Sequence, residues 1–319
     1  MQKDELLLAL REGGFVTGEE LGRRFGVSRA AVSKAMAALK REGFPITSVP
    51  NRGYCLQGES EKLTDSAIRA NLSGHPWRDN LHVFPVIDST NNWLKNEAAA
   101  GAPHGTCAVA DCQLAGRGRL GRRFDSAPGS GVYLSVLLRP ACPASELMTL
   151  TAQAAVAVCS AIEKSCGVRP GVKWVNDLVL GGRKICGILT ELSLEAESGL
   201  VSYAIIGAGV NCNRAAADFP PELREIAGSI LSQTGTRVDR NRLAAQMIRE
   251  LSALPKLDWR EPYRAACVNL GRRVRLLSPG GPERDGVALD LGENAELIVR
   301  FDDGRVEAVN AGEISLREG

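Results

Sequence analysis

Glycines and arginines alternate in the stretch from Gly116 to Phe124, which reads GRGRLGRRF. Glycines leave backbone N–H groups accessible and let the chain approach a ligand closely. Guanidinium groups bind phosphates and carboxylates through paired hydrogen bonds. The first acidic residue after these arginines is Asp125, so the arginines would repel one another until an anion arrives. The pattern predicts a mobile loop that orders over a phosphate or carboxylate, with a solvated basic loop as the alternative.

The first six residues of this stretch, GRGRLG, match the G-x-G-x-x-G pattern of dinucleotide-binding turns. In those turns the third glycine opens a helix, because the pyrophosphate binds at the N-terminus of that helix. Here Pro128 and Gly129 interrupt the segment after Gly121, and residues 132–136 are typical of a strand. The sequence also contains no protein-kinase motif set and no Walker A sequence. The pattern therefore does not indicate a Rossmann, kinase or P-loop site.

Three further segments place polar side chains at the ends of predicted strands. They contain, in chain order, Asp88–Asn91, then Lys173, Asn176, Asp177 and Lys184, and last Gly207, Gly209 and Asn211. The first of them lies at a strand-to-helix junction, where helix N-termini attract anions. Each segment alone could be a structural turn. With the arginine loop they supply cations for phosphates, a carboxylate and an amide near a metal, and polar groups for a small polar ligand.

The elements that would position these residues lie between about residues 64 and 270. Periodicity predicts strands at 81–87, 106–113, 131–139, 171–175, 184–194 and 200–211. It predicts helices at 64–72, 91–100, 145–166, 221–233, 239–253 and 259–268. Strands followed by single helices, together with a hairpin-like pair, indicate a mixed sheet with helices. The region from 271 to 319 instead predicts short alternating strands with a hairpin turn at 302–304, as in a small β-barrel.

Residues 1–63 predict a helix-turn-helix followed by a β-hairpin wing. A first helix buries Leu21 and Phe25 and ends at Gly26, and Ser28 caps a second helix. Between Arg23 and Arg41 there are basic residues and no acidic one, which fits phosphate contacts better than a solvated face. The residues expected to contact DNA are Ser28, Arg29, Ser33, Lys34 and Arg52 of the wing turn. A generic dimerisation or scaffold domain is the alternative.

The composition excludes several classes of protein. The chain has 319 residues, 44% apolar and 24% charged, with a net charge of +2, so it is not a polycation. It lacks a signal-peptide pattern and an uninterrupted apolar run long enough for a membrane span, which predicts a cytoplasmic protein without a membrane partner. Its nine cysteines form no C-x-x-C pair, and the three histidines are distant from most of them. Reduced thiols are therefore expected, rather than disulfides or a zinc site.

The combined motifs resemble those of biotin–protein ligases. They are S-T-N at 89–91, Q-x-A-G-R-G-R-x-G-R at 113–122, K-W-x-N-D at 173–177, R-K-x-x-G-I-L-x-E at 183–191 and G-x-G-x-N at 207–211. With the helix-turn-helix, the chain resembles the bifunctional ligases that also repress the biotin operon, the BirA family. The resemblance implies an α+β multidomain fold. It has a winged helix-turn-helix at 1–63, a central sheet like that of class II aminoacyl-tRNA synthetases at 64–270, and an SH3-like barrel at 271–319.

The resemblance also implies roles for individual residues. Biotin would be bound by Ser89, Thr90, Asn91, Gln113, Gly116, Arg117, Gly118, Arg119 and Lys184. The nucleotide would be bound by Arg122, Phe124, Lys173, Asn176 and Asn211. Asp177 would serve a Mg²⁺ ion, and Lys184, Arg119 and Arg117 would be catalytic. The sequence departs from the family pattern at Leu120, Phe124 and Val175, where Arg, Trp and Pro are common.

The implied activity is ATP-dependent formation of biotinyl-5′-AMP, followed by transfer of biotin to a lysine of the biotin carboxyl carrier protein. Operator DNA would be a further partner, and the protein would form a homodimer when biotinyl-adenylate is bound. Biotin would thus be both a substrate and the precursor of a corepressor. Two rival functions remain open from the sequence, namely a catalytically silent biotin-sensing repressor and a lipoate-type protein ligase. A ligase without repressor activity is also compatible with the sequence.

Overall fold

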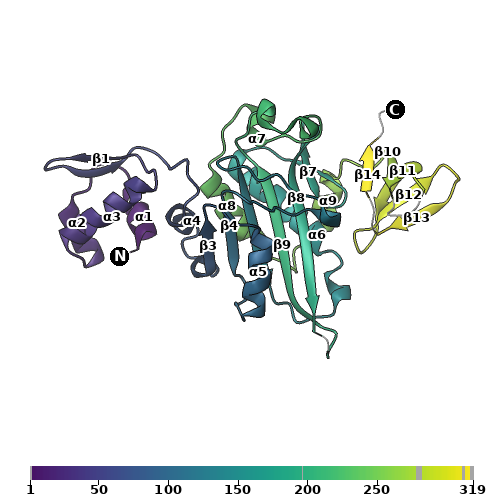
Figure 1. Cartoon of the computed structure of the whole chain (residues 1–319), viewed down its shortest axis with the longest axis horizontal. Coiled ribbons are helices and arrows are strands. Elements are labelled where there is room, and N and C mark those ends of the chain that lie inside the picture. The colour runs from purple at the N-terminus through teal and green to yellow at the C-terminus, as the bar shows by residue number, and fades with distance from the viewer. Residues whose placement is uncertain (1, 196, 278–281, 311–312, 317–319) are drawn as a thin grey trace.

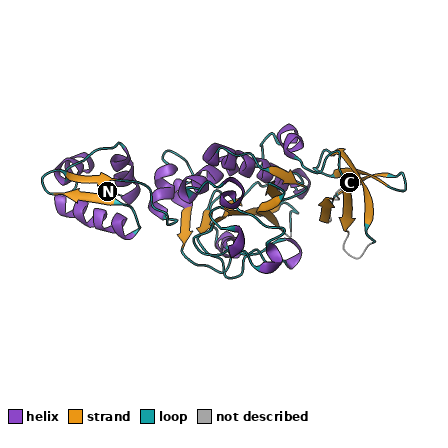
Figure 2. Ribbon diagram, turned by 90° about the horizontal axis from the view of Figure 1, so that it is seen from above, coloured by secondary structure: helices purple, strands orange, loops and turns teal. Residues whose placement is uncertain are grey.

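The computed structural model of the chain shows three lobes arranged in a row (Figure 1). It describes all residues except 1, 196, 278–281, 311–312 and 317–319. The N-terminal and C-terminal lobes lie on opposite sides of the large central lobe, and the view from above in Figure 2 shows the same order. Parts of the region 271–319, for which short strands are predicted, lie outside the described residues, namely 278–281, 311–312 and 317–319.

The N-terminal lobe is a winged helix-turn-helix. Its elements are α1 (Lys3–Arg11), α2 (Gly18–Phe25), α3 (Arg29–Arg41), β1 (Ile46–Val49) and β2 (Gly53–Leu56). Gly26 ends α2 in the left-handed conformation, and the Ser28 hydroxyl accepts a hydrogen bond from the Ala31 N–H at 3.2 Å. Apolar side chains of α1, α2 and α3 form a single buried core. The predicted caps and turn are therefore confirmed, although Phe25 is only half-buried.

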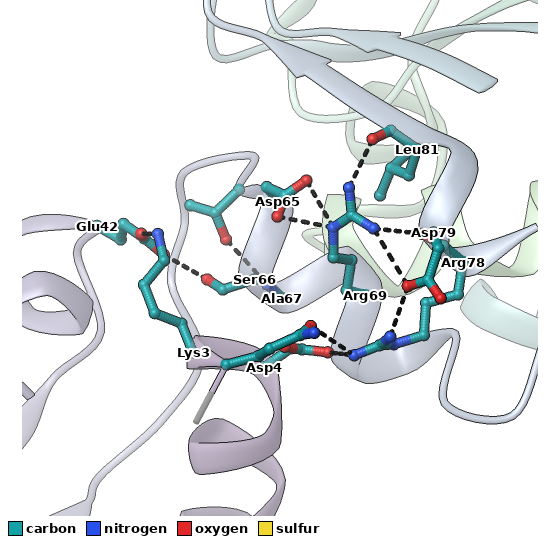
Figure 3. Close-up of polar contacts among 12 residues, drawn as sticks. Lys3, Asp4, Glu42, Asp65, Ser66, Ala67, Arg69, Arg78, Asp79 and Leu81 are labelled. Atoms are coloured by element: carbon teal, nitrogen blue, oxygen red, sulfur yellow. Dashed lines mark hydrogen bonds and ion pairs between the residues drawn. The ribbon is translucent and has the colours of Figure 1, made fainter. Parts of the chain in front are cut away.

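This lobe is docked on the central lobe through polar contacts between α1 and the region around α4 (Asp65–Asn71) (Figure 3). The Asp4 carboxylate accepts a hydrogen bond from the Arg78 guanidinium, which also contacts Asp79 at 2.6 Å. Arg69 binds Asp65 at 2.8 Å and donates to the Leu81 carbonyl at 2.6 Å. Ala67 and Ala70 of α4 belong to the apolar core of the N-terminal lobe. The winged helix is therefore packed against α4.

Replacing Arg78 with alanine is expected to weaken this docking by about 3 kcal/mol, because it leaves the carboxylate of Asp4 buried without its partner. Denaturant unfolding followed by tryptophan fluorescence would measure the loss. Arg23→Ala is a matched control, because the Arg23–Glu19 pair is exposed on both sides and should contribute less than about 1 kcal/mol. Equal stability of the two variants would contradict a structural role for the Asp4–Arg78 pair.

The central lobe is built on a seven-stranded sheet with the order β3-β4-β5-β9-β8-β7-β6. The strands are β3 (Leu81–Phe84), β4 (Cys107–Ala110), β5 (Gly131–Leu138), β6 (Gly171–Lys173), β7 (Asp177–Leu180), β8 (Arg183–Leu194) and β9 (Val201–Asn211). β3 and β4 are parallel, and the other neighbours are antiparallel. The predicted mixed sheet is confirmed.

Helices cover both faces of the central sheet, as Figure 1 shows. One face packs against α6 (Leu150–Cys166) and α8 (Arg240–Leu251) in the main apolar core. The other face packs against α5 (Thr90–Ala99), where Leu94 and Ala98 contact side chains of β4, β5 and β9. The remaining helices are α7 (Ile230–Thr234) and α9 (Arg260–Ala266). The α5 side of the sheet also carries the candidate site.

The C-terminal lobe is a five-stranded antiparallel sheet with the order β13-β12-β11-β10-β14. Its strands are β10 (Arg273–Leu277), β11 (Arg284–Leu291), β12 (Leu297–Phe301), β13 (Val306–Val309) and β14 (Glu313–Leu316). β12 and β13 are joined by the turn predicted at 302–304, in which Gly304 has a φ of 86°. The lobe contacts the centre through the Trp174 indole, whose N–H donates to the Ala295 carbonyl at 2.8 Å.

Two predictions about the central lobe are wrong. The strand β7 was not predicted between Lys173 and Lys184, so Asp177 begins a strand instead of following one. The predicted helix at 221–233 is a short 3-10 turn (Pro221–Leu223) followed by an irregular segment and the short α7.

The helical segment Ala144–Cys166 is long and apolar enough to span a membrane. However, 67% of its most apolar 18-residue stretch is buried inside the protein, as expected for a core helix.

Candidate functional site

A cavity of about 390 Å³ lies on the α5 side of the central sheet. Its lining comes from the start of α5, the loop 113–126, the strands β5 to β9, the segment 219–227 and Leu277 of β10. Six of the described lining residues are cationic and two are acidic. The cationic ones are Arg117, Arg119, Arg122, Arg123, Lys173 and Lys184, and the acidic ones are Asp125 and Asp177. The cavity therefore suits an anionic ligand.

Glycines on neighbouring strands form the floor of the cavity. Gly207 and Gly209 of β9 lie on the same face of the sheet as Gly187 of β8, because Gly187 pairs with Gly209. A β-carbon at Gly209 would meet the Phe124 ring at 2.6 Å, and one at Gly207 would collide with the Asn91 amide. The missing side chains thus leave the room that these two groups occupy.

The polar end of the cavity is formed by the start of α5 and by Gln113. The side-chain oxygen Oε1 of Gln113 accepts hydrogen bonds from the Thr90 N–H at 2.9 Å and from the Thr90 hydroxyl at 3.0 Å. The Ser135 hydroxyl contacts Thr90 Oγ1 at 2.7 Å and donates to the side-chain oxygen Oδ1 of Asn91 at 2.5 Å. Ser89 caps α5 by accepting from the Asn92 N–H at 3.4 Å. This end is therefore a preorganised network of small donors and acceptors.

The arginine loop folds back on itself beside the cavity. The Gly118 N–H donates to the Arg122 carbonyl at 2.7 Å, and the Phe124 N–H donates to the Gly116 carbonyl at 2.9 Å. Leu120 and Gly121 form the tip with φ angles of 55° and 74°. Gly116 does not line the cavity. It packs against the other side of the loop, where a β-carbon would meet the Phe124 carbonyl and the Ser126 hydroxyl.

The loop arginines have partners, which corrects the prediction that they repel one another unpaired. Arg117 Nη1 donates to Asn92 Oδ1 at 2.9 Å, and Arg123 Nη2 donates to the Leu114 carbonyl at 2.9 Å. Arg119 Nη1 donates to Asn176 Oδ1 at 3.1 Å, across the cavity. Asn92 and Asn176 lie far from the loop in sequence, and all three of these partner groups are neutral.

Lys184 and Asp177 form an ion pair in the cavity, with 2.7 Å between Lys184 Nζ and Asp177 Oδ1. They meet because β7 and β8 are joined by a tight turn at Gly181 and Gly182. The Asn176 amide nitrogen donates to the Ile188 carbonyl at 2.8 Å, which orients its oxygen toward Arg119. The structure thus brings Lys184, Asp177, Asn176 and Arg119 together.

The remaining predicted ligand-binding residues also line the cavity. Lys173 lies opposite Asp177 in the β6–β7 pair. The Asn211 amide donates to the Gly228 carbonyl at 3.0 Å. The Phe124 ring lies over Gly187 and Gly209 and meets Tyr133 edge-on, with 6.3 Å between the ring centroids.

One wall of the cavity was missed by sequence reasoning. It consists of Phe219, Leu223, Ile226 and Ala227, together with Leu277 of the C-terminal lobe. The Lys184 N–H donates to the Ile226 carbonyl at 2.8 Å, which fixes this wall against β8. Pro220 and Pro221, which disfavour a continuous helix, were the available signal.

The predicted DNA-binding residues are exposed on the N-terminal lobe. Arg29, Ser33 and Lys34 lie on α3, and Ser28 uses its hydroxyl to cap that helix. Arg52 lies in the turn of the wing with its guanidinium 4.3 Å from the centre of the Phe15 ring. The structure therefore places these residues on two adjacent elements of one lobe.

The cysteines and the other side chains that could bind a metal are dispersed over the described part of the chain. All nine cysteines are free thiols, as expected. No three His, Cys, Asp or Glu side chains gather in the described residues as a metal site would require. In the cavity, the only described carboxylate near the Lys184 ammonium is that of Asp177.

Two family models match the chain. The Biotin/lipoate A/B protein ligase family matches residues 83–211, and an HTH domain model matches residues 2–55. The bifunctional ligase/repressor BirA of Escherichia coli is 33% identical, and the match covers 98% of this chain and 96% of that protein. The protein of the same name from Bacillus subtilis is 39% identical, covering 75% and 74%. The biotin protein ligase of Aquifex aeolicus, solved in complex with biotin and ATP, matches with a TM-score of 0.61 at 28% identity, over 75% of this chain and 99% of that one.

The fold and the cavity define a ligand-binding α+β domain that is joined to a DNA-binding type of winged helix-turn-helix. The match to the Escherichia coli protein spans 98% of this chain and so includes both parts. The chain belongs to the BirA family of bifunctional biotin ligases and repressors.

Proposed function

We propose that this chain is an ATP-dependent biotin–[biotin carboxyl carrier protein] ligase that also represses biotin synthesis genes. The observation that carries the ligase half is the cavity with a polar network at one end and cations at the other. A ligand with a small polar head and an anionic tail, such as biotin, matches this division. The relatives named as ligase and repressor and the neighbour solved with biotin and ATP support the same function.

The proposed reaction has two steps. A carboxylate oxygen of biotin attacks the α-phosphorus of ATP, and the bond to the leaving pyrophosphate breaks. The ε-amine of the acceptor lysine then attacks the acyl carbon of biotinyl-5′-AMP. The bond to AMP breaks, and the amine proton passes to solvent. Neither step needs a nucleophile from the protein, so catalysis rests on positioning and on charge neutralisation.

In this proposal the cations hold the two anionic reactants together. Lys184, Arg119 and Arg117 would face the biotin carboxylate and the α-phosphate, which otherwise repel each other. Gly118, which lines the cavity, would let the loop backbone come close to the ligand. The biotin head group would contact Ser89, Thr90, Asn91 and Gln113 at the polar end.

The nucleotide would occupy the part of the cavity between the arginine loop and the wall at 219–227. Arg122, Lys173, Asn176 and Asn211 line this part, and the Phe124 ring offers a face for adenine. A Mg²⁺ ion would neutralise part of the triphosphate charge. Among the described residues, the Asp177 carboxylate would supply one ligand to this ion. The phosphates of ATP would supply others, as is usual for Mg²⁺ at nucleotide sites.

The ligase proposal is tested by incubating the protein with ATP, Mg²⁺ and a biotin carrier domain, with either biotin or lipoate. A mass increase of one biotinyl group on one acceptor lysine is expected with biotin. A mass increase with lipoate alone would instead support the lipoate-type ligase. Biotin binding without any transfer would indicate a silent biotin-sensing repressor.

The repressor half is supported by the exposed basic face of α3. Replacing Lys34 with alanine is expected to weaken operator binding about 3- to 30-fold and to reduce the salt dependence by about one phosphate contact. Fluorescence anisotropy with labelled operator DNA at several salt concentrations would measure both. Biotin transfer should be unchanged, which separates the two halves of the function. Lys164→Ala, on the central lobe, is the control.

Ligand-linked homodimerisation is proposed through the part of β8 that extends beyond β7. Leu192 and Leu194 are exposed there, and β7 pairs with β8 only as far as Gly187. An open strand edge of this kind can pair with a second copy. Sedimentation with and without biotin and ATP tests it, and an unchanged association constant would remove the proposed switch.

The finer assignments of fold also remain proposals. We assign residues 1–63, 64–270 and 271–319 to the three domains, with a central domain like those of class II aminoacyl-tRNA synthetases. The five-stranded C-terminal sheet would close as an SH3-like barrel. Free thiols and a buried α6 fit a cytoplasmic protein without a membrane partner.

A further inference from the structure

The carboxylate of Glu191, on β8, lies where the polar end of the cavity meets the arginine loop. Asn91 Nδ2 donates to its Oε2 at 2.8 Å, and Lys95 Nζ donates to its Oε1 at 2.7 Å. Arg117 Nη1 lies 4.0 Å from the same Oε1. One side chain thus contacts two residues of α5 and one residue of the loop.

The contact with Asn91 fixes the direction of its amide. Asn91 is only 4% exposed, and its carbonyl oxygen accepts from the Ser135 hydroxyl while its nitrogen donates to Glu191. The amide packs against Gly207, where a β-carbon would collide with it. Without the carboxylate, the nitrogen would lose its acceptor, and a flipped amide would turn a donor toward the Ser135 hydroxyl. Glu191 therefore sets which group Asn91 can offer to a ligand.

The contact with Arg117 ties the arginine loop to the same place. Arg117 donates to Asn92, which follows Asn91 on α5, and its guanidinium remains close to the Glu191 carboxylate. Lys95 lies one turn further along α5 and binds the other side of that carboxylate. The loop and the helix therefore share one anion.

The environment of Glu191 keeps this anion charged. Burial raises the pKa of the carboxyl group, but hydrogen bonds from Lys95 and Asn91 and the charges of Lys95 and Arg117 lower it below its usual value. Glu191 is half-buried, so its charge is less screened by water than that of a surface residue. The attraction on Arg117 is accordingly present at neutral pH.

We propose that Glu191 is a positioning residue, because its carboxylate holds both the Asn91 amide and the Arg117 guanidinium. The polar end of the cavity and the arginine loop are thereby fixed relative to each other. The inference rests on the proposed ligase function, because the ligand it concerns is biotinyl-5′-AMP. Glu191 acts through Asn91 and Arg117 and has no contact with the reacting atoms in this scheme.

The test uses the full chain with Glu191→Gln, which keeps the shape of the side chain and removes its charge. Dissociation of radiolabelled biotinyl-5′-AMP is expected to be about tenfold faster, and the KM for biotin to rise by a similar factor. The kcat for pyrophosphate release should change less than the KM, because Lys184 and Arg119, which also face the α-phosphate, keep their own contacts. A purely structural role would lower the melting temperature without this split between KM and kcat.

The matched control is Glu197→Gln, which removes the same charge from an exposed position in the turn after β8 and should behave as the wild type. Arg117→Ala and the double variant Arg117→Ala/Glu191→Gln complete a cycle. If Glu191 acts partly through Arg117, the dissociation rate of biotinyl-5′-AMP in the double variant should rise by less than the product of the two single-variant increases. Wild-type dissociation in Glu191→Gln, or fully additive effects, would overturn the proposal. A wild-type protein that forms no adenylate would instead refute the proposed function.

Discussion

Replacing Lys184 with alanine is expected to lower the rate of adenylate formation by about 100- to 1000-fold, with a smaller effect on biotin binding. The Lys184 ammonium lies in the cationic half of the cavity, where a carboxylate and a triphosphate must come together. Without this ammonium, the repulsion between the biotin carboxylate and the triphosphate is less well compensated when the adenylate forms. Single-turnover release of pyrophosphate would measure this rate directly.

The effect of Lys184→Ala has a second possible source, which a double variant separates. Asp177 loses its ion-pair partner, and its carboxylate then faces the anionic ligand alone. Asp177→Asn combined with Lys184→Ala removes that repulsion. If the missing cation limits the rate, the double variant stays slow. Recovery to near the wild-type rate would show that the role of Lys184 is to neutralise Asp177. Lys164→Ala, on the exposed side of α6, should retain a normal burst of pyrophosphate.

Local sequence signals predicted the N-terminal lobe well. Gly26 and the Ser28 cap act within one or two helical turns, and both are found as expected. The strands on both sides of the arginine loop were likewise predicted, because long apolar runs bounded by turns need no knowledge of distant residues. The residues predicted to bind biotin and the nucleotide line one cavity, except Gly116.

The errors arose where distant contacts determine the structure. β7 has four residues, too few for periodicity, although Gly181 and Gly182 adopt the positive φ angles of a two-residue hairpin turn. Residues 224–229 lie beside β8, because backbone hydrogen bonds join them to Lys184. No local sequence pattern predicts such a contact. The partners of the arginines, such as Asn92 and Asn176, are neutral and distant in sequence, so a search for acidic neighbours could not find them.

Replacing Arg119 with glycine is expected to speed dissociation of biotinyl-5′-AMP by about 10- to 100-fold, while adenylate formation continues. Arg119 reaches across the cavity to Asn176 and also lines a second cavity of about 210 Å³ beside the C-terminal lobe. Its side chain therefore borders both cavities. Without it, adenylate should escape and modify lysines on unrelated proteins. Filter retention of labelled adenylate and a count of biotinylated lysines on a bystander protein would measure both effects.

Two companion variants show which property of Arg119 retains the adenylate. Glycine removes the side chain and also loosens the backbone, whereas Arg119→Ala removes only the side chain, so similar rates for both would assign the effect to the guanidinium. Asn176→Ala keeps the guanidinium but removes its partner across the cavity, and should give an intermediate rate if that hydrogen bond positions Arg119. An unchanged dissociation rate in Arg119→Gly would contradict the closure of the loop over the ligand, because Arg119 connects the loop to Asn176 on the opposite wall of the cavity.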